Sequence, residues 1–314
     1  MLKIGLIGGG WHATRQHAPA LRHCAGEPEF RGAVELAGVC DVDRTKAEAA
    51  AAEFGFGHAY SSIEAMLPHV DAVLSILQPM ALLSALPIIL RRGRDLAVLI
   101  EKPLGTNLDE ARRLAQLLDG RPHMVSLNRR FDPAVVMARA WMAEQSPPQA
   151  IHGLMARHDR RERDFTWGTG IHLCDLMCFL VGPLRLVGGA GDGGGVGKVA
   201  LLSGADDLRG TVHIHPACGR VDESVQVFAD DWAVEIVAGT HQPWRVRCWK
   251  AGREEINAAA APDAPEFERN GTAQETRAFL RAALGRAPFA PTVAEALPGT
   301  ELAASLQAWA DSPK

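Results

Sequence analysis

The sequence lacks an apolar run of the length that a bilayer span needs, since its longest candidate, residues 81–90, contains Ser84 and Pro87. It lacks a surplus of either charge, because the net charge is only −4, and so it misses the electrostatic signature of nucleic-acid-binding proteins. Its six cysteines are irregularly spaced, which argues against a disulfide framework. The N-terminus also lacks the long apolar core and cleavage site of a signal peptide. We therefore expect a cytoplasmic protein without nucleic-acid or membrane partners.

What is present is typical of a globular protein: 47% of the 314 residues are apolar and 22% are charged, enough for one large domain or two ordinary ones. In residues 1–127, short apolar stretches alternate with helical patterns, which predicts an α/β domain with a doubly wound parallel sheet. The expected strands are 2–7, 34–40, 58–60, 71–77, 96–100 and 122–127, and the expected helices are 13–22, 44–54, 63–67, 80–92 and 108–118.

A glycine cluster follows the first strand directly. The run from Gly8 to Ala13 fits the pattern G-x-G-x-x-G/A, with Gly8 and Gly10 as its glycines. Such glycines let the backbone turn tightly and approach a pyrophosphate at the start of the next helix, where Trp11, His12 and Ala13 lie. Glycine clusters are also common in ordinary turns, so this motif needs the strand–turn–helix context around it.

The second strand ends at Asp41. An acidic residue at this position accepts hydrogen bonds from the ribose hydroxyls of NAD and repels the 2′-phosphate of NADP. Nearby Arg44 could neutralise that phosphate, so NADP stays an alternative. Asp41 could instead cap the next helix, but Asp43 is better placed to do so.

Lys102 follows the unbroken apolar run at residues 96–100, which predicts a strand buried on both faces. Lys102 therefore lies at the carboxyl end of a parallel strand, where such sheets bind ligands. A half-shielded lysine loses solvation, which favours its neutral form and suits proton transfer with a substrate hydroxyl. The alternative is a surface lysine in a strand-to-helix turn.

Residues 128–314 predict a second, α+β domain. Its expected helices are 133–144, 274–284 and 292–309, and its expected strands are 151–157, 211–215, 225–228, 233–237 and 245–249. We expect loops at 188–195 and 258–264. Residues 170–180 have helical spacing and contain His172, Asp175 and two cysteines, which could simply be packed or capping groups. A metal site of His172, Cys178 and His213 or His215 lacks a tight ligand pair, so we predict none.

These motifs together resemble the glucose–fructose oxidoreductase, inositol dehydrogenase and rhizopine-catabolism family (Gfo/Idh/MocA). The matching stretches are residues 5–10, 17–21, 39–43, 71–73, 101–104, 129–133 and 170–175, in the family's order. The resemblance implies an N-terminal Rossmann domain and a C-terminal domain whose open, mostly antiparallel sheet often forms the subunit interface. It also implies hydride transfer between a nicotinamide and a polyol or sugar, and a homodimer or homotetramer.

The resemblance also implies roles for individual residues. His172 would be an acid/base group beside Lys102, and Asp175 would orient it or the substrate. The cofactor would be flanked by Leu77, Gln78, Pro79 and Glu101, and the substrate pocket would be lined by residues such as Arg129, Arg157, Arg163 and Trp167. The chain departs from the family at Gly168, where relatives commonly have an aspartate close to the lysine.

The function that these observations favour is an NAD(P)-dependent dehydrogenase, with NAD as the expected cofactor and a secondary alcohol of a sugar- or cyclitol-like compound as substrate. Two alternatives stay open: an NAD-dependent glycosidase of the same architecture, and a non-catalytic cofactor- or sugar-sensing protein, which Gly168 makes credible. Stoichiometric reduction of the cofactor would separate the dehydrogenase from both.

Overall fold

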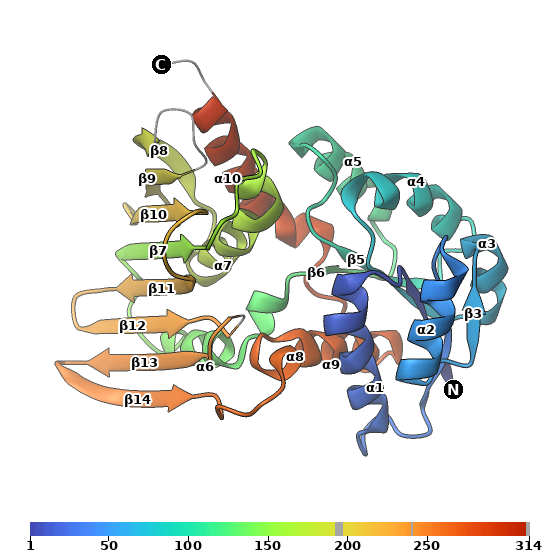
Figure 1. Ribbon diagram of the computed structural model, residues 1–314. Helices are drawn as coiled ribbons and strands as arrows, with labels where there is room; N and C mark the ends of the chain where they lie inside the picture. Colours follow the sequence, from blue (N-terminus) through green and yellow to red (C-terminus); the bar gives the residue numbers. More distant parts are fainter. Residues whose placement is uncertain (192–196, 240, 312–314) are drawn as a thin grey trace. The chain divides into compact units, whose positions relative to one another are not determined.

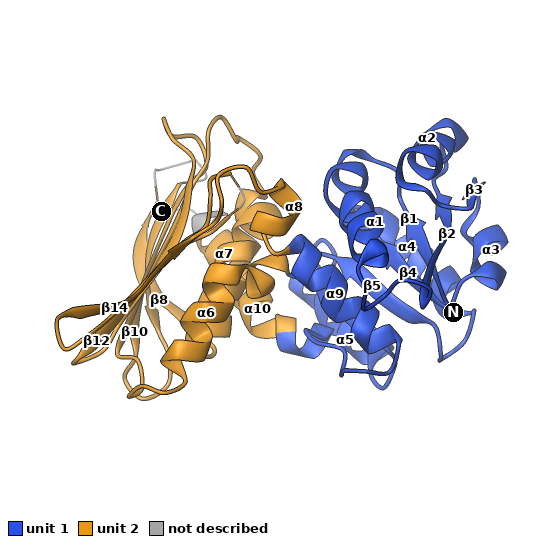
Figure 2. Ribbon diagram, turned by 90° about the horizontal axis from the view of Figure 1, so that it is seen from below, with its two compact units in different colours: residues 1–127, 272–295 blue, residues 128–271, 296–314 orange. Residues whose placement is uncertain are grey.

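The computed structural model describes residues 1–191, 197–239 and 241–311. The chain divides into two compact units, one of residues 1–127 and 272–295, the other of residues 128–271 and the chain from 296 onward (Figure 2). No helix within the described ranges combines the length and apolar character needed to cross a bilayer.

The first unit is built on a six-stranded parallel sheet in the order β3-β2-β1-β4-β5-β6 (Figure 1). Its strands are β1 (Leu2–Ile7), β2 (Val34–Cys40), β3 (His58–Tyr60), β4 (Ala72–Ser75), β5 (Ala97–Glu101) and β6 (His123–Ser126). Every residue of β4, β5 and β6 is buried, as expected for strands covered on both faces. The predicted doubly wound sheet is confirmed, and strands β1, β2 and β3 have the predicted bounds.

Helices follow the strands in turn. They are α1 (Ala18–Gly26), preceded by a π-helical turn at Ala13–His17, then α2 (Arg44–Phe54), α3 (Ile63–Met66), a 3₁₀ turn at Leu67–His69, α4 (Pro79–Leu90) and α5 (Leu108–Leu118). Side chains set their first turns: Asp43 accepts from Thr45 N–H in α2, and Asn107 accepts from Glu110 N–H in α5. Right-handed crossovers place α1 and α2 on one face of the sheet, and α4 and α5 on the other.

One segment of the first unit comes from far along the chain. Helix α9 (Thr272–Ala283) packs on α1, where Arg277 forms a two-pronged ion pair with Glu27 and the Cys24 thiol donates to Ala273 O. Beyond α9, Pro291 O accepts from Val125 N–H in β6. The sequence predicted a single domain boundary, after residue 127, which places α9 and the residues after it in the second domain. Helical spacing in a sequence shows that a helix forms, but it does not show which sheet that helix covers.

The second unit is built on an eight-stranded sheet in the order β14-β13-β12-β11-β7-β10-β9-β8. Its strands are β7 (Ala150–Ala156), β8 (Arg185–Gly191), β9 (Lys198–Ser203), β10 (Arg209–His215), β11 (Asp222–Phe228), β12 (Trp232–Val237), β13 (Arg245–Lys250) and β14 (Arg253–Ala259). Neighbours pair antiparallel, except that β7 and β10 run parallel. The mostly antiparallel sheet is therefore confirmed.

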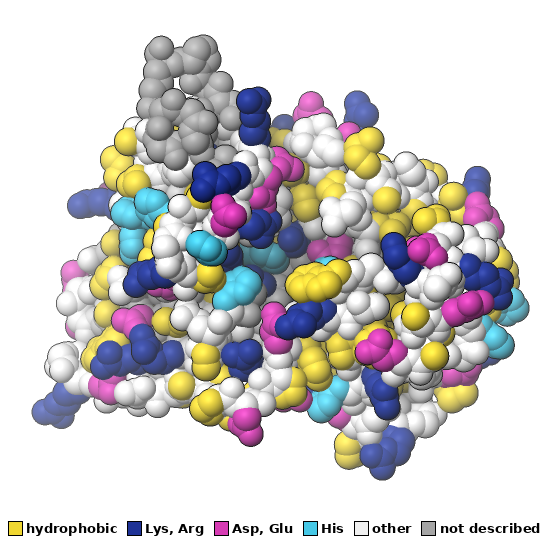
Figure 3. All heavy atoms as spheres, viewed as in Figure 1, with side chains coloured by type: hydrophobic (Ala, Val, Ile, Leu, Met, Phe, Trp, Pro, Cys, Tyr) yellow, Lys and Arg dark blue, Asp and Glu magenta, His cyan; other side chains and the backbone are white. Residues whose placement is uncertain are grey.

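Helices cover one face of this sheet. They are α6 (Pro133–Met142), preceded by a 3₁₀ turn at Asn128–Phe131, then α7 (Ile171–Val181), preceded by a π-helical turn at Thr166–Gly170, and α10 (Val293–Asp311); the short α8 (Glu266–Arg269) follows β14 in the chain. The core lies between the sheet and α6, α7 and α10. On the opposite face, which we call the open face, Val187, Val199 and Leu201 are exposed. Histidine side chains gather over the strands near β10 in Figure 3.

Two loop predictions for this unit are wrong in part. Residues 188–191 belong to β8, while the rest of the expected loop at 188–195 lies outside the described residues. A Cβ at Gly189 would lie 2.3 Å from Val199 O, so glycine is needed where β8 approaches β9, and its presence signalled close packing and not a loop. Residues 258 and 259, expected in a loop, end strand β14.

Candidate active site

A glycine turn follows β1 at the carboxyl edge of the first sheet. Gly8 has φ +99°, and a Cβ there would lie 2.6 Å from Ile76 O, so only glycine fits. Nothing lies within 4 Å of the Cβ position at Gly10, which leaves the backbone open to an approaching ligand. The first helical hydrogen bond runs from Thr14 N–H to Gly10 O, so the preceding N–H groups have no acceptor within the helix. The turn therefore offers donors suited to a pyrophosphate.

The turn also lies at the point where the strand order of the sheet reverses. From the adjacent pair β1 and β4, the order runs outward through β2 and β3 on one side and through β5 and β6 on the other. Open α/β sheets bind ligands in the crevice outside the carboxyl ends of the strands at such a switch point.

Asp41 follows β2 and is tied to the glycine turn. Its Oδ2 accepts from Gly9 N–H at 2.7 Å, and its Oδ1 accepts from Asp43 N–H at 2.8 Å. Asp43 caps α2, which confirms that the cap is not Asp41. Arg44 is exposed and its Nε lies 2.8 Å from Glu48 Oε1. Asp41 thus lies at the position from which a ribose can be held, while Arg44 is bound to a neighbouring carboxylate.

Large apolar side chains are exposed after three strands of this edge. Trp11 is 72% exposed after β1, Val42 is 94% exposed after β2, and Met80 is 66% exposed after β4. Exposed apolar groups at a switch point are suited to contact a ligand. Among the residues expected to flank the cofactor, Leu77 and Pro79 are half-buried and Gln78, which precedes α4, is exposed.

Lys102 directly follows β5 at the same edge. It is half-buried, and its peptide bond to Pro103 is cis. The preceding residue, Glu101, is the last of β5 and is buried. The structure therefore places Lys102 at the carboxyl end of a buried strand, as predicted.

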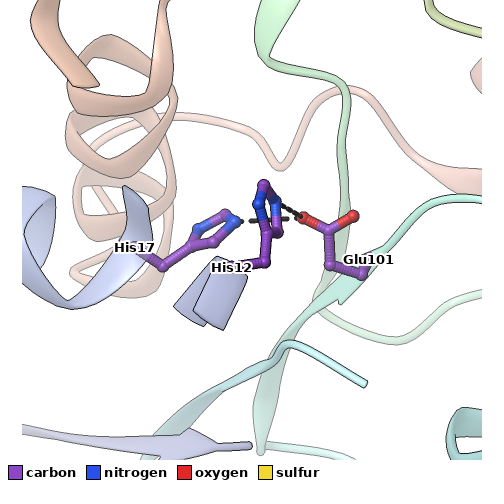
Figure 4. A group of neighbouring side chains, drawn as sticks. All are labelled: His12, His17 and Glu101. Atoms are coloured by element: carbon purple, nitrogen blue, oxygen red, sulfur yellow. Dashed lines mark hydrogen bonds and ion pairs between the residues drawn. The ribbon is translucent and has the colours of Figure 1, made fainter. Parts of the chain in front are cut away.

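Glu101 is held by two histidines. His12 Nε2 lies 3.1 Å and His17 Nε2 lies 3.0 Å from the same oxygen, Glu101 Oε1 (Figure 4). Burial acts to raise the pKa of Glu101, but its hydrogen bonds and charge interactions with His12 and His17 bring it well below the usual range. Burial lowers the pKa of His17, against the opposing effect of Glu101. The sequence predicted Glu101 and His12 as cofactor-binding residues but gave no role to His17.

These features fit a dinucleotide. Gly8, Gly10 and the residues from Trp11 to Ala13 would hold the pyrophosphate, and Asp41 would hold the adenosine ribose. The fit rests on the open Cβ position at Gly10 and on the N–H groups at the start of the helix, which have no acceptor within the helix.

In the second unit, the predicted acid/base residue His172 is buried in the first turn of α7. Asp175 lies one turn further on in α7 and is also buried. Arg130 binds Asp175 through both carboxylate oxygens, at 2.9 and 2.7 Å. Burial raises the pKa of Asp175, and Arg130 acts against this rise. Sequence reasoning placed Asp175 beside His172 or the substrate and missed its partner Arg130.

Two of the expected pocket residues, Arg129 and Arg157, are buried and bound to one carboxylate. Arg129 donates through Nε at 2.9 Å and through a terminal nitrogen at 3.1 Å to Glu223, and Arg157 also donates to Glu223. Although burial raises the pKa of Glu223, the two guanidiniums lower it to about 2. Glu223 was missed, although it occupies an inward position of β11 together with Val225 and Val227, a pattern in which a charged residue needs a buried partner.

The remaining site residues lie in the π-helical turn before α7. Trp167 is buried, and Gly168 has nothing within 4 Å of its Cβ position. Lys198, fully buried on β9, donates to the Thr166 hydroxyl at 2.6 Å. Sequence reasoning did not single out Lys198. The open Cβ position shows that the backbone at Gly168 has room for a side chain.

Comparisons with known proteins agree with this geometry. Residues 2–129 match a family described as "Oxidoreductase family, NAD-binding Rossmann fold". The glycine turn, its place at the switch point of the sheet and this family match together define an NAD(P)-binding Rossmann oxidoreductase. This segment, residues 2–129, belongs to the NAD-binding part of the Gfo/Idh/MocA family. A comparison with curated proteins finds no match.

Solved structures share the fold over both units. UDP-N-acetylglucosamine 3-dehydrogenase from Acidithiobacillus ferrooxidans has a TM-score of 0.78 at 20% identity, covering 98% of this chain and 97% of that chain. A Gfo/Idh/MocA family oxidoreductase from Vibrio cholerae has a TM-score of 0.80 at 20% identity, covering 98% of each chain. A variant of a 3-ketoreductase from Actinomadura kijaniata, in complex with TDP-benzene and NADP, has a TM-score of 0.74 at 19% identity, covering 96% and 95%.

Proposed function

We propose that this oxidoreductase transfers hydride between a nicotinamide cofactor, preferably NAD, and a secondary alcohol of a sugar- or cyclitol-like substrate. The observation that carries the proposal is that the glycine turn, Asp41 and Lys102 follow β1, β2 and β5 at one carboxyl edge, around the switch point between β1 and β4. Two structural relatives named for chemistry at a sugar hydroxyl or ketone support this substrate class.

In this proposal each residue has a limited task. The bound nicotinamide supplies or accepts the hydride. Asp41 orients the cofactor through the ribose, and Glu101, fixed by its two histidines, orders the backbone that leads into Lys102. Lys102 takes the proton from the substrate hydroxyl during oxidation, or returns it during reduction. His172 is proposed as the assisting acid/base group.

The residues expected to line the substrate pocket have a different role in this proposal. Arg129 and Arg157 both donate to Glu223 in buried ion pairs, and Asp175 accepts from Arg130 in another. We propose that Arg129, Arg157 and Asp175 act on the substrate by fixing the local backbone and not through their charged groups. Trp167, in the π-helical turn, is the proposed direct contact.

We also propose that the protein is a homodimer or homotetramer assembled through the open face of the second sheet. The exposed Val187, Val199 and Leu201 on adjacent strands β8 and β9 support this, because an uncovered apolar face tends to be buried by a partner.

The test is a screen of sugars, cyclitols, sugar acids and nucleotide sugars for NADH formation by the purified protein. Stoichiometric NADH formation with at least one of them is expected. Sugar release without net NADH would replace the proposal with the glycosidase. Binding of cofactor and sugar without turnover of any compound would replace it with a sensor.

A further inference from the structure

We propose that His12, His17 and Glu101 form a binding site for a divalent transition-metal ion, with zinc as the best match. The three side chains come from the glycine turn, the π-helical turn after it and the end of β5 (Figure 4). Their ligand atoms all lie within 4.8 Å of one another. Within the described parts of the chain, this is the group of three such side chains whose ligand atoms converge in this way. The sequence alone predicted no metal site.

The separations are close to those of a zinc site. Zinc binds imidazole nitrogen and carboxylate oxygen at about 2.0–2.2 Å, which puts neighbouring ligand atoms of a tetrahedral site about 3.3 Å apart. In the structure, Glu101 Oε1 lies 3.1 Å from His12 Nε2 and 3.0 Å from His17 Nε2. These two separations need to change by only a few tenths of an ångström to seat the ion, and the third, between the ligand nitrogens of the two histidines, is at most 4.8 Å. Two imidazoles and one carboxylate with a further position for water are also the ligand set of one class of zinc enzyme.

The local backbone explains why these histidines meet. In an α-helix, residues five apart point about 140° away from each other. Here Ala18 N–H bonds to Ala13 O, five residues back, in the π-helical turn of Ala13–His17. This wider turn carries His12 and His17 toward one side, and such turns frequently occur at functional sites. The turn thus brings both imidazoles to the one carboxylate.

The site combines burial with an entry path. The side chains of His17 and Glu101 are 2% and 7% exposed, whereas that of His12 is 47% exposed, so an ion can enter from the His12 side. Both hydrogen bonds of Glu101 fall on Oε1, and Oε2 accepts none from the described residues. Oε2 is therefore available as an additional ligand or as an acceptor for a bound water.

A simple hydrogen-bond network, in which both histidines donate Nε2–H to Oε1, is the alternative. His17 Nδ1 is buried and has no hydrogen-bond partner among the described residues. Nothing therefore fixes the proton of this ring on one nitrogen, and the proton can leave Nε2 when a metal binds. Because Nδ1 lacks a partner in both states, its burial does not favour the network over the metal site.

The experiment measures metal and not activity. Protein treated with a chelator is titrated with Zn²⁺ in a calorimeter, without dinucleotide, and Co²⁺ is added in parallel because its visible absorption reports the coordination geometry. We expect one ion per chain, and His12→Ala and Glu101→Gln should each weaken Zn²⁺ binding at least as much as the loss of an outer-shell partner, about 10–100-fold. Circular dichroism verifies that each variant is folded. His12 is the main target because its exposed side chain is the least needed for folding.

Two control variants locate the ion. His58→Ala removes an exposed histidine of the first unit, and His213→Ala removes one of three neighbouring histidines, with His152 and His215, on the open face. Both should bind Zn²⁺ like the unmodified protein. The proposal is overturned if the unmodified protein binds no ion, if folded His12→Ala and Glu101→Gln bind as tightly as before, or if His213→Ala abolishes binding. None of these outcomes bears on the proposed hydride transfer, which the substrate screen tests separately.

Discussion

Asp41 holds the backbone N–H of Gly9 through its Oδ2, at 2.7 Å, so the acidic tip of β2 and the glycine turn after β1 form one connected structure. The same carboxylate that would receive the ribose also shapes the turn that would receive the pyrophosphate. A change at Asp41 therefore affects both ends of the proposed cofactor contact, and the experiments must separate charge from hydrogen bonding.

Cofactor choice is the first prediction. The unmodified protein should bind NAD at least about tenfold more tightly than NADP, because a carboxylate beside a 2′-phosphate is a like-charge contact. Asp41→Asn should narrow or reverse this gap while keeping an acceptor for Gly9 N–H. Asp41→Ala should do the same and also weaken NAD. Titration calorimetry checks all three proteins, and equal or tighter NADP binding by the unmodified protein would contradict the prediction and make Arg44 the next residue to test.

The second prediction concerns Lys102. On a substrate found by screening, Lys102→Ala should lower kcat by about 10²–10⁴-fold, the usual contribution of a general acid or base. The affinity for NAD should change little, because the glycine turn and Asp41 are untouched. His172→Ala should lower kcat by as much as Lys102→Ala only if His172 and Lys102 act as a unit. Steady-state kinetics and calorimetry provide the readouts, and normal turnover by Lys102→Ala would rule out the proposed role.

The third prediction uses the space beside Gly168. Gly168→Ala should fold and turn over nearly normally, because nothing lies within 4 Å of the new Cβ. Gly168→Asp should lower kcat/KM about tenfold or more, because the added carboxylate would misplace or repel the substrate. A tenfold decrease corresponds to a transition state that is less stable by roughly 1.4 kcal/mol. The appearance of activity only in Gly168→Asp would instead show that the unmodified chain is not an active oxidoreductase.

The fourth prediction concerns the buried carboxylate of Glu223. Glu223→Gln should lower the free energy of unfolding by about 3–5 kcal/mol at pH 7, because two buried guanidiniums lose their partner. The pKa of Glu223 lies at about 2 in the folded protein against an ordinary 4.5, so its stabilising contribution is complete above pH 4.5 and declines as the pH falls toward 2. The difference between the two proteins in urea denaturation should therefore shrink over this range.

Glu235→Gln is the matched control for Glu223. Glu235 pairs with Arg245 at 2.9 Å on neighbouring strands, but this pair is partly exposed, and such pairs contribute about 0–1 kcal/mol. An equal loss of stability in both variants would contradict the role assigned to burial.

Assembly is the fifth prediction. Light scattering at micromolar concentration should show a dimer or tetramer, and Leu201→Asp should shift it toward the monomer by placing a charge on the open face. Val136→Asp is the control, because Val136 is also exposed but lies on α6. A monomeric unmodified protein would count against the proposal.

Much of the first unit follows from local signals in the sequence. Periodicity and capping residues such as Asp43 and Asn107 determine α2 and α5 to the residue, because both signals lie within a few positions of the helix. The glycine turn and Lys102 also lie where the sequence placed them, since each follows an apolar strand directly. These are properties of short segments, and short segments are what a single sequence describes well.

Several of the failures involve partners far apart in the chain. Glu223 binds Arg129 across 94 positions, and Arg277 binds Glu27 across 250. No local pattern specifies such pairs. His17 was missed for another reason: the π-helical turn changes which residues share a side, and helical spacing assumes α geometry. In β8, glycines needed for close strand packing were taken for a loop because both uses have the same composition.

The position of α9 on α1 has a consequence for biosynthesis. An emerging chain can form β1 to β6 once residue 126 is available, but the partner of Glu27 is residue 277, and the acceptor for Val125 is residue 291. The ribosome must therefore make the whole of strands β7 to β14 before the first sheet receives its last covering helix. Although amino-terminal domains generally fold first during synthesis, this one starts early and is completed late.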